Sequence, residues 1–297
     1  PGLANIVSVS SLLNSEGMLY LGVGVSDTQG NFKGGIVKLT SEGLADASFG
    51  QQGLLVLDSL DAPFEGVSAL CFDPQGNILA SGVRQTGNGE GWVTVYKIDK
   101  DGLPVMSFGN NGLVSYLQRN KDGYKTQASR PDMKVSPDGS ILLSGIITYG
   151  QFNDLAFMRL LPNGELDTNF GVNGQISQGV GNNPIDFDKL VWLKDGRMLN
   201  AGMFGSSSAS VMFFAKTAKG HTDSTVFYLH EALQIRYFGE YALSYSANST
   251  LNLEFLHYLP ENNQIYAGFN VSGPSSSGMP TRGPGFCRRI SRRRAAG

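Results

Sequence analysis

The chain has 297 residues, of which 41% are hydrophobic and 16% are charged, and its formal net charge is −2. This amount of apolar material excludes an intrinsically disordered chain, and the near-neutral charge excludes a global basic field that would hold nucleic acid. No uninterrupted apolar run in the sequence approaches the roughly 18 residues that a membrane-spanning helix needs, so no membrane span is predicted. The 39 glycines instead indicate an all-β protein that is dense in turns.

The first predicted elements are an alternating run at residues 6–9 and a hairpin that closes on a glycine at position 22. The same unit, a turn followed by a short apolar strand that ends in glycine, recurs along the chain. Its clearest copies occupy residues 73–82 and 136–145, where Pro-Gln-Gly and Pro-Asp-Gly are strong hairpin signals. The closing glycines lie at positions 22, 82, 145, 202 and 268, which predicts five units.

A second recurring element is an alternating strand that ends in a basic residue beside an aliphatic one. Its copies occupy residues 35–39, 93–98, 155–160, 211–216 and 285–290. The last copy makes the arginine-rich C-terminal segment a strand of the final unit. We interpret its cluster as the solvated end of that strand, with a phosphate-binding patch as the alternative. The cluster consists of Arg288, Arg289, Arg292, Arg293 and Arg294.

The third recurring element is a phenylalanine turn, Phe-Gly-x-x-Gly, followed by a further strand. Its three clear copies have their phenylalanines at Phe49, Phe108 and Phe170, which are 59 and 62 residues apart. One glycine in each copy allows a backbone φ above zero, and we expect the aromatic ring to fill the space between neighbouring repeats. No lysine and helix follow these glycines, so the element is not a phosphate-binding loop.

Together these elements predict an all-β, single-domain five-bladed β-propeller built from four-stranded repeats of about 60 residues. A two-sheet sandwich is the alternative, but a sandwich does not require a recurring signature of this length. The expected repeats span residues 1–53, 54–112, 113–174, 175–233 and 234–297.

Residues 160–171, Leu-Leu-Pro-Asn-Gly-Glu-Leu-Asp-Thr-Asn-Phe-Gly, resemble the delta-60 repeat, a bacterial propeller-type repeat. Gly43 and Gly102 precede their phenylalanines by six residues, as Gly164 precedes Phe170. The fourth copy departs from this pattern, and a fifth phenylalanine turn would lie beyond residue 297. The resemblance implies a propeller fold and a bacterial, secreted or cell-envelope location, in a family without an established activity.

Ligands of propellers commonly bind at the loops that surround the central axis. The longest polar insertion of the regular part, residues 118–126, precedes a strand that we expect to line the channel, and it carries Tyr124. Tyr237 and Tyr241 lie in an aromatic-rich stretch that either packs inside a blade or forms a sugar-binding surface. We therefore predict a non-catalytic module, expected to be a monomer, that binds a carbohydrate or a protein.

The alternative is a glycan-acting hydrolase that uses a pair of channel-facing carboxylates as acid and as base or nucleophile. The predicted register places Asp132, Asp188 and Glu254 near the channel on three different repeats, although none of them lies in a recognisable catalytic motif. No metal or cofactor is predicted, because the three histidines lack metal spacing and the acidic loop at residues 27–31 holds too few carboxylates for calcium. Whether Cys71 and Cys287 pair is left open, although Cys71 reads as a small buried apolar residue.

Overall fold

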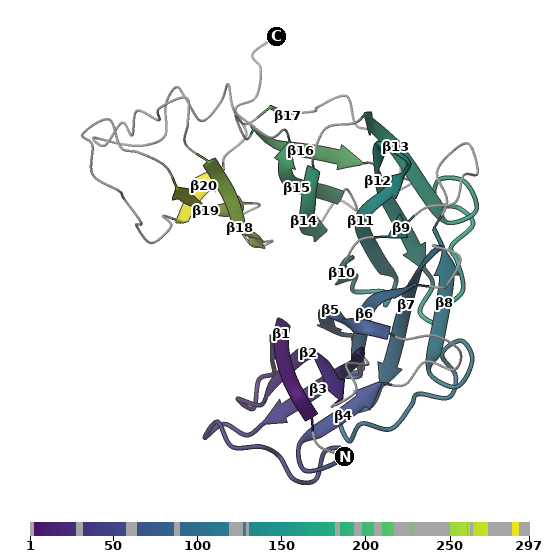
Figure 1. Ribbon diagram of the computed structural model, residues 1–297, viewed down its shortest axis with the longest axis vertical. Coiled ribbons are helices and arrows are strands. Elements are labelled where there is room, and N and C mark those ends of the chain that lie inside the picture. The colour runs from purple at the N-terminus through teal and green to yellow at the C-terminus, as the bar shows by residue number, and fades with distance from the viewer. Residues whose placement is uncertain are drawn as a thin grey trace. The chain divides into compact units, whose positions relative to one another are not determined.

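The computed structural model describes residues 3–27, 32–57, 64–85, 90–118, 127–128, 131–181, 185–192, 198–204, 210–216, 227–228, 250–259, 261, 264–272 and 287–290. Within these ranges the chain forms antiparallel β-sheets and no helix, as Figure 1 shows. It divides into two compact units, Pro1–Gly179 and Val180–Gly297, which are described separately.

The first unit contains three sheets, each built by strands that follow one another along the chain. The first sheet has the order β1 (Leu3–Leu13), β2 (Leu19–Asp27), β3 (Phe32–Leu39), β4 (Leu54–Leu57). The second has the order β5 (Phe64–Phe72), β6 (Ile78–Gln85), β7 (Gly91–Ile98), β8 (Leu113–Leu117). The third has the order β10 (Asp132–Val135), β11 (Ile141–Tyr149), β12 (Phe152–Leu160), β13 (Gln175–Gly181), and the short β9 (Gln127–Ala128) also pairs with β11.

The second unit contains two more sheets of the same antiparallel pattern. The fourth sheet has the order β14 (Ile185–Trp192), β15 (Met198–Phe204), β16 (Ser210–Lys216), β17 (Phe227–Tyr228). The fifth has the order β18 (Thr250–Leu259), β19 (Gln264–Ser272), β20 (Cys287–Ile290). The predicted all-β class is thus confirmed, and the first, second and fourth sheets have the expected four strands, whereas the third has a fifth, short strand and the fifth has three in the described residues. β20 confirms the strand expected in the arginine-rich segment. The arginines beyond it lie outside the described residues.

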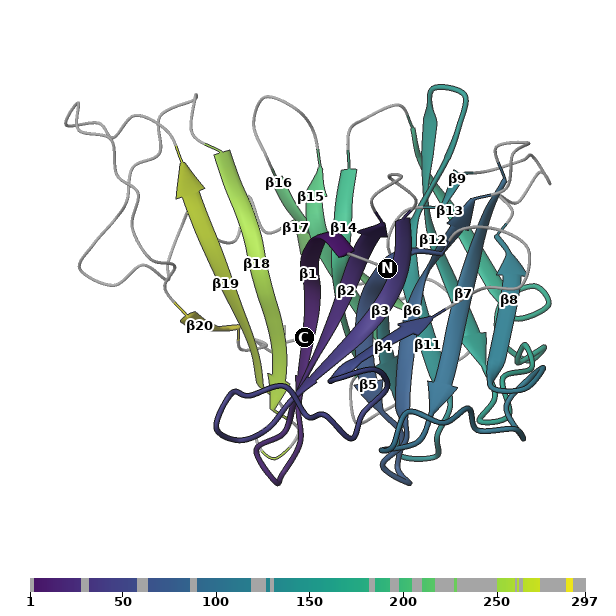
Figure 2. The same ribbon diagram turned by 60° about the horizontal axis from the view of Figure 1, so that its bottom comes forward.

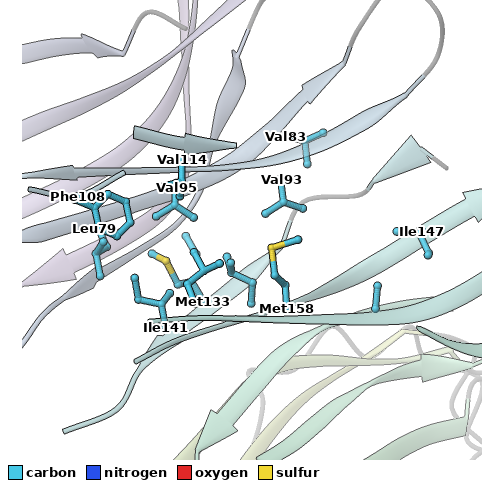
Figure 3. Close-up of a cluster of buried hydrophobic side chains, with 14 residues drawn as sticks. Leu79, Val83, Val93, Val95, Phe108, Val114, Met133, Ile141, Ile147 and Met158 are labelled. Carbon is cyan, nitrogen blue, oxygen red and sulfur yellow. The ribbon is translucent and has the colours of Figure 1, made fainter. Parts of the chain in front are cut away.

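The second sheet is buried on both faces because its strands alternate between two apolar clusters. On β6, Ile78 and Ala80 belong to a cluster shared with the first sheet, whereas Leu79 and Val83 belong to a cluster shared with the third. Figure 3 shows the latter cluster, in which Met133 and Met158 of the third sheet meet side chains of the second. A sheet covered by a neighbour on each face is what the stacking of repeats in a propeller requires.

The phenylalanine turns repeat the same backbone geometry in each sheet of the first unit. Phe49, Phe108 and Phe170 are at most 1% exposed. The glycine after each ring has a positive φ of 52–57°, and a side chain there would run into the backbone carbonyl of the following strand. The glycines are therefore required by the turn itself, as the sequence predicted.

The same phenylalanines fill the space between neighbouring sheets, which confirms the role expected for them. Gly102 of the second sheet's turn lies against the ring of Phe49, where an added Cβ would come within 3.1 Å of the ring. Gly164 of the third sheet's turn lies in the same way against Phe108, at 3.0 Å. Backbone bonds reinforce this contact, since the Gly109 N–H donates to the Asn163 carbonyl at 2.8 Å.

Candidate functional site

The sheets of the first unit have two chemically different ends. The β1–β2 and β3–β4 connections and their equivalents, which include the phenylalanine turns, lie at one end, which we call the turn end. The β11–β12 hairpin lies at the opposite end, which we call the loop end, as Figure 2 shows. The insertion at residues 119–126, with the predicted binding residue Tyr124, falls outside the described residues.

Charged side chains at the turn end are engaged in a repeated structural arrangement. A basic residue lies eleven positions before each phenylalanine and points over its ring, with Lys38 at 5.6 Å, Lys97 at 5.6 Å and Arg159 at 4.9 Å from the ring centroid. Each cation also pairs with a carboxylate. The pairs are Lys38–Asp46 at 2.9 Å, Lys97–Asp73 at 2.8 Å and Arg159–Asp167 at 2.5 Å. These contacts neutralise partly buried charge and stabilise the fold.

The loop end of the third sheet carries an aromatic pair, half-buried Tyr149 and exposed Phe152, at the tip of the β11–β12 hairpin. The rings of Tyr149 and Phe152 pack at 5.8 Å between centroids with an interplanar angle of 33°. Phe152 is nevertheless 43% exposed. Gly150 between them has a φ of +60° and no atom within 4 Å of where its Cβ would be, so it forms the tight turn without touching a neighbour. The hairpin therefore presents a ring face to solvent.

A buried carboxylate anchors this aromatic pair from behind. Asp154 is 1% exposed, and the Tyr149 hydroxyl donates to one of its oxygens at 3.0 Å. The Ser177 hydroxyl on β13 donates to the other oxygen. Next to them, the Thr148 hydroxyl donates to the Asn153 side-chain oxygen at 2.9 Å. These bonds tie the hairpin to the neighbouring strand and fix the orientation of the Tyr149 ring.

An exposed ring beside hydroxyl and amide groups is suited to a ligand that has both an apolar face and hydroxyl groups. Sequence analysis predicted the binding loop at residues 118–126 and missed this hairpin, because a two-residue turn with glycine is also an ordinary structural turn. The signal was present in Tyr149-Gly150-Gln151-Phe152, where two aromatic residues flank a two-residue turn that contains glycine.

The three candidate catalytic carboxylates each lie in the first strand of their sheet. Asp132 opens β10, whereas Asp188 lies in β14 and Glu254 in β18. Asp132 is in the first unit, and its side chain is described below. Asp188 and Glu254 are in the second unit, and their side chains fall outside the described residues. Tyr237 and Tyr241 also lie outside them. Whether these residues form a site stays a prediction.

Asp132 lies in a partly buried polar environment. Its side chain is 16% exposed and pairs with Lys134 at 3.2 Å, and it accepts the Met133 N–H at 2.8 Å. Burial by itself would lower the pKa of the Lys134 ammonium. Attraction to the Asp132 carboxylate is the stronger effect, so the pKa is raised. Asp132 therefore has at least one structural function, which is to hold a charged lysine beside the second sheet.

Cys71 on β5 is a free thiol that packs against the apolar cluster between the second and third sheets. It donates to the Met133 carbonyl at 3.0 Å, and burial raises its pKa to about 11. Cys71 is therefore a small apolar residue of the core, as predicted, although it is only partly buried. In the described part of the chain, no group of three or more metal-binding side chains occurs. Nor does any helix there have the length and hydropathy to cross a membrane.

Comparison with known proteins identifies the fold. A family model described as a β-propeller domain of unknown function, DUF5122, matches residues 136–170. That segment holds the third sheet's hairpin, its basic strand and its phenylalanine turn. A search of curated sequences gives no match. The match supports a relationship to a β-propeller family of unknown function.

Solved structures agree on the fold at low sequence identity. A protein of unknown function from Dyadobacter fermentans is 13% identical, with a TM-score of 0.50 over 92% of this chain and 80% of its own. A glucose dehydrogenase is 11% identical, with a TM-score of 0.53 over 99% of this chain and 87% of its own. A Hadza microbial sialidase is 11% identical, with a TM-score of 0.53 over 91% of this chain, which spans only 53% of that protein. These similarities, with the all-β sheets, show a propeller-like fold.

Proposed function

We propose that the chain is a non-catalytic binding module of a bacterial secreted or cell-surface protein, and that it presents the loop end to a carbohydrate or protein ligand. In this proposal the five sheets are five blades of one propeller of the delta-60 type, with the repeat boundaries predicted from the sequence. The observation that carries the proposed function is the exposed ring of Phe152, which lies on an anchored hairpin at the loop end.

The position of this ring favours binding over packing. Burying a ring of this size releases about 1.5–3 kcal/mol, so leaving it in solvent on a rigid hairpin forgoes stability. Its neighbour Tyr149, which packs against it, is held in place by a hydrogen bond to Asp154. A preorganised aromatic surface loses little conformational entropy when a ligand docks, which favours affinity.

The test is a glycan-array measurement on the full chain, with a hydrolysis readout on the same sugars. We expect saturable binding without turnover, and a loss of at least tenfold in affinity for Phe152→Ala, equivalent to about 1.4 kcal/mol. Val172→Ala is the matched control, because Val172 is an even more exposed apolar side chain (78%) at the turn end. Equal binding by both variants would reject the hairpin as the site.

The alternative function is a glycan-acting hydrolase, and one observation favours it: Asp132, Asp188 and Glu254 each lie in the first strand of a sheet. In this alternative two of the three serve as acid and as base or nucleophile. Turnover of a bound sugar that is abolished by Asp188→Asn or Glu254→Gln, with binding retained, would establish it. Binding without turnover would leave the module as proposed.

A further inference from the structure

Asp154 differs from other buried carboxylates of the first unit in the groups that contact it. Two carboxylates at the turn end, which are each 6% exposed, pair with a basic side chain; the pairs are Lys97–Asp73 and Arg159–Asp167. Asp154 is 1% exposed, and its two oxygens accept hydrogen bonds from the hydroxyl groups of Tyr149 and Ser177. Among the described residues, no lysine or arginine pairs with it. Its contacts are therefore with neutral donors, which leave its negative charge in place.

The fold does not require an acidic residue at this position. Asp154 lies five residues before the basic residue that covers the phenylalanine ring, and the equivalent residues of the first and second sheets are Lys33 and Trp92. All three pair with the same position of their central strand, so they are equivalent in structure as well as in sequence. A buried charge without a counterion costs stability. A function other than folding therefore explains why the third sheet has one here.

This charge lies directly behind the aromatic pair of the β11–β12 hairpin. The Tyr149 hydroxyl donates to Asp154 at 3.0 Å, and the Tyr149 ring packs against Phe152 at 5.8 Å between centroids. A phenol that donates to a carboxylate gains electron density on its ring, which strengthens the negative ring face that attracts cations. On β13 an exposed glycine, Gly179, adjoins the carboxylate, and its missing Cβ would lie 3.5 Å from the Asp154 oxygen. The aromatic pair therefore combines an apolar face with a negative electrostatic potential.

A ligand that suits this surface has a flat apolar face and a positive charge. At this hairpin one ring, that of Phe152, is exposed, at 43%. Several rings are needed to enclose a quaternary ammonium group, whereas a single ring is enough to stack on the C–H face of a sugar. An amino sugar has such a face and carries a protonated amine on the same ring. It therefore meets both requirements.

We infer that the β11–β12 hairpin selects glycans that carry free, protonated amino groups, and that the charge of Asp154 supplies this selectivity. The inference rests on the binding function proposed for the loop end, and it names the class of carbohydrate bound there. Asp154 is buried behind Tyr149, so it acts on the ligand through its electrostatic field and not by contact. It is a specificity-determining residue, whereas Phe152 is the residue that touches the sugar.

The first test compares two oligosaccharides on the full chain, one with charged amines and one without. Oligomers of glucosamine are cationic at mildly acidic pH, whereas oligomers of N-acetylglucosamine have the same sugar ring and are neutral. In isothermal titration calorimetry we expect the cationic oligomer to bind more tightly by a factor of about ten or more, and this preference should shrink as salt is added. Affinities that are equal or favour the neutral oligomer, or no binding of either, would overturn the inference.

Protein variants show whether the charge of Asp154 causes the preference. Asp154→Asn removes the charge and keeps groups that can bond to the Tyr149 and Ser177 hydroxyls, so we expect the preference for the cationic oligomer to disappear. Glu165→Gln is the matched control, because it removes one exposed charge at the turn end of the same sheet, and it should leave the preference unchanged. A preference that persists in Asp154→Asn, or that falls equally in the control, would overturn the inference. If Asp154→Asn does not fold, the salt dependence in the unmodified protein tests the same claim.

A lysine-rich protein is another source of ammonium groups, and an oligolysine peptide in the same assay separates the two sources. Tighter binding of this peptide than of the glucosamine oligomer would overturn the inference in favour of a protein ligand. Such a failure leaves the proposed function standing. That function requires only that Phe152 contributes to binding some carbohydrate or protein, which the comparison of Phe152→Ala with Val172→Ala decides.

Discussion

Replacing Asp73 by asparagine removes the carboxylate that neutralises Lys97, and we expect this to destabilise the first unit. The two side chains are 2% and 10% exposed, and their charged atoms lie 2.8 Å apart. Asparagine keeps the oxygen that accepts the backbone N–H groups of Gln75 and Asn77, so the backbone bonds of the turn are preserved, although the second oxygen's bond from the Asn77 side-chain amide at 2.8 Å is lost. The larger loss is the charge partner of a buried ammonium, a change that costs about 3 kcal/mol.

For a unit of this size that loss corresponds to a fall in the melting temperature of roughly 6–12 °C. Urea unfolding followed by Trp92 fluorescence, in a Trp192→Phe background, reports on the second sheet specifically. Asp101→Asn is the control, because Asp101 is 59% exposed and pairs with Lys100 at the surface. We expect the control to change the free energy of unfolding by less than about 0.5 kcal/mol.

A rescue variant tests the reasoning more sharply. In the first and third sheets the carboxylate lies three residues before the phenylalanine, as Asp46 and Asp167, and the second sheet has Val105 there. The backbone matches, since the N–H groups of Asp46 and Val105 donate to the carbonyls of Lys38 and Lys97 at 2.9 and 3.0 Å. Val105→Asp should therefore restore much of the stability lost in Asp73→Asn. An equal effect of Val105→Asp in both backgrounds would refute this account.

Three further outcomes are expected. Hydrogen bonds from Ser48 and Lys38 lower the pKa of Asp46 from 3.8 to about 2. The stabilising effect of this carboxylate is therefore complete above about pH 4 and is lost as the pH falls through about 2. In urea titrations, the difference in free energy of unfolding between the protein and Asp46→Asn should disappear over that pH range. Burial raises the pKa of Cys71 to about 11, so the thiol should react with a disulfide reagent at pH 8 only after unfolding. Gly164→Ala should cost about 1–3 kcal/mol in chemical denaturation, because φ is +91° and the added methyl group would meet the preceding repeat's phenylalanine at 3.0 Å.

Much of the first unit could be predicted from the sequence because its signals are backbone requirements. Gly50 and its equivalents must adopt positive φ, and the apolar alternation of β6 and β7 places side chains on both faces of a sheet. Such requirements produce the same residue types at a fixed spacing in every repeat. The Tyr149–Asp154–Ser177 network produces no such pattern, since it joins side chains from three strands and their separation in the sequence does not predict that they touch.

The ion pairs at the turn end combine a feature that the backbone determines, which the sequence predicts, with a side-chain contact, which it does not. The cation and the ring keep an eleven-residue spacing because the backbone connects them: the Lys38 N–H donates to the Gly53 carbonyl at 2.9 Å, and the Lys97 N–H to the Gly112 carbonyl at 2.8 Å. The carboxylate reaches the cation through its side chain alone, so it can come from the phenylalanine turn or, as with Asp73, from the hairpin turn of the same sheet. Sequence spacing therefore predicts where each cation lies but not which turn neutralises it. Side chains that bind a ligand can likewise come from any of several loops, since no backbone hydrogen bond fixes their spacing. The repeat therefore predicts the fold more readily than the binding site.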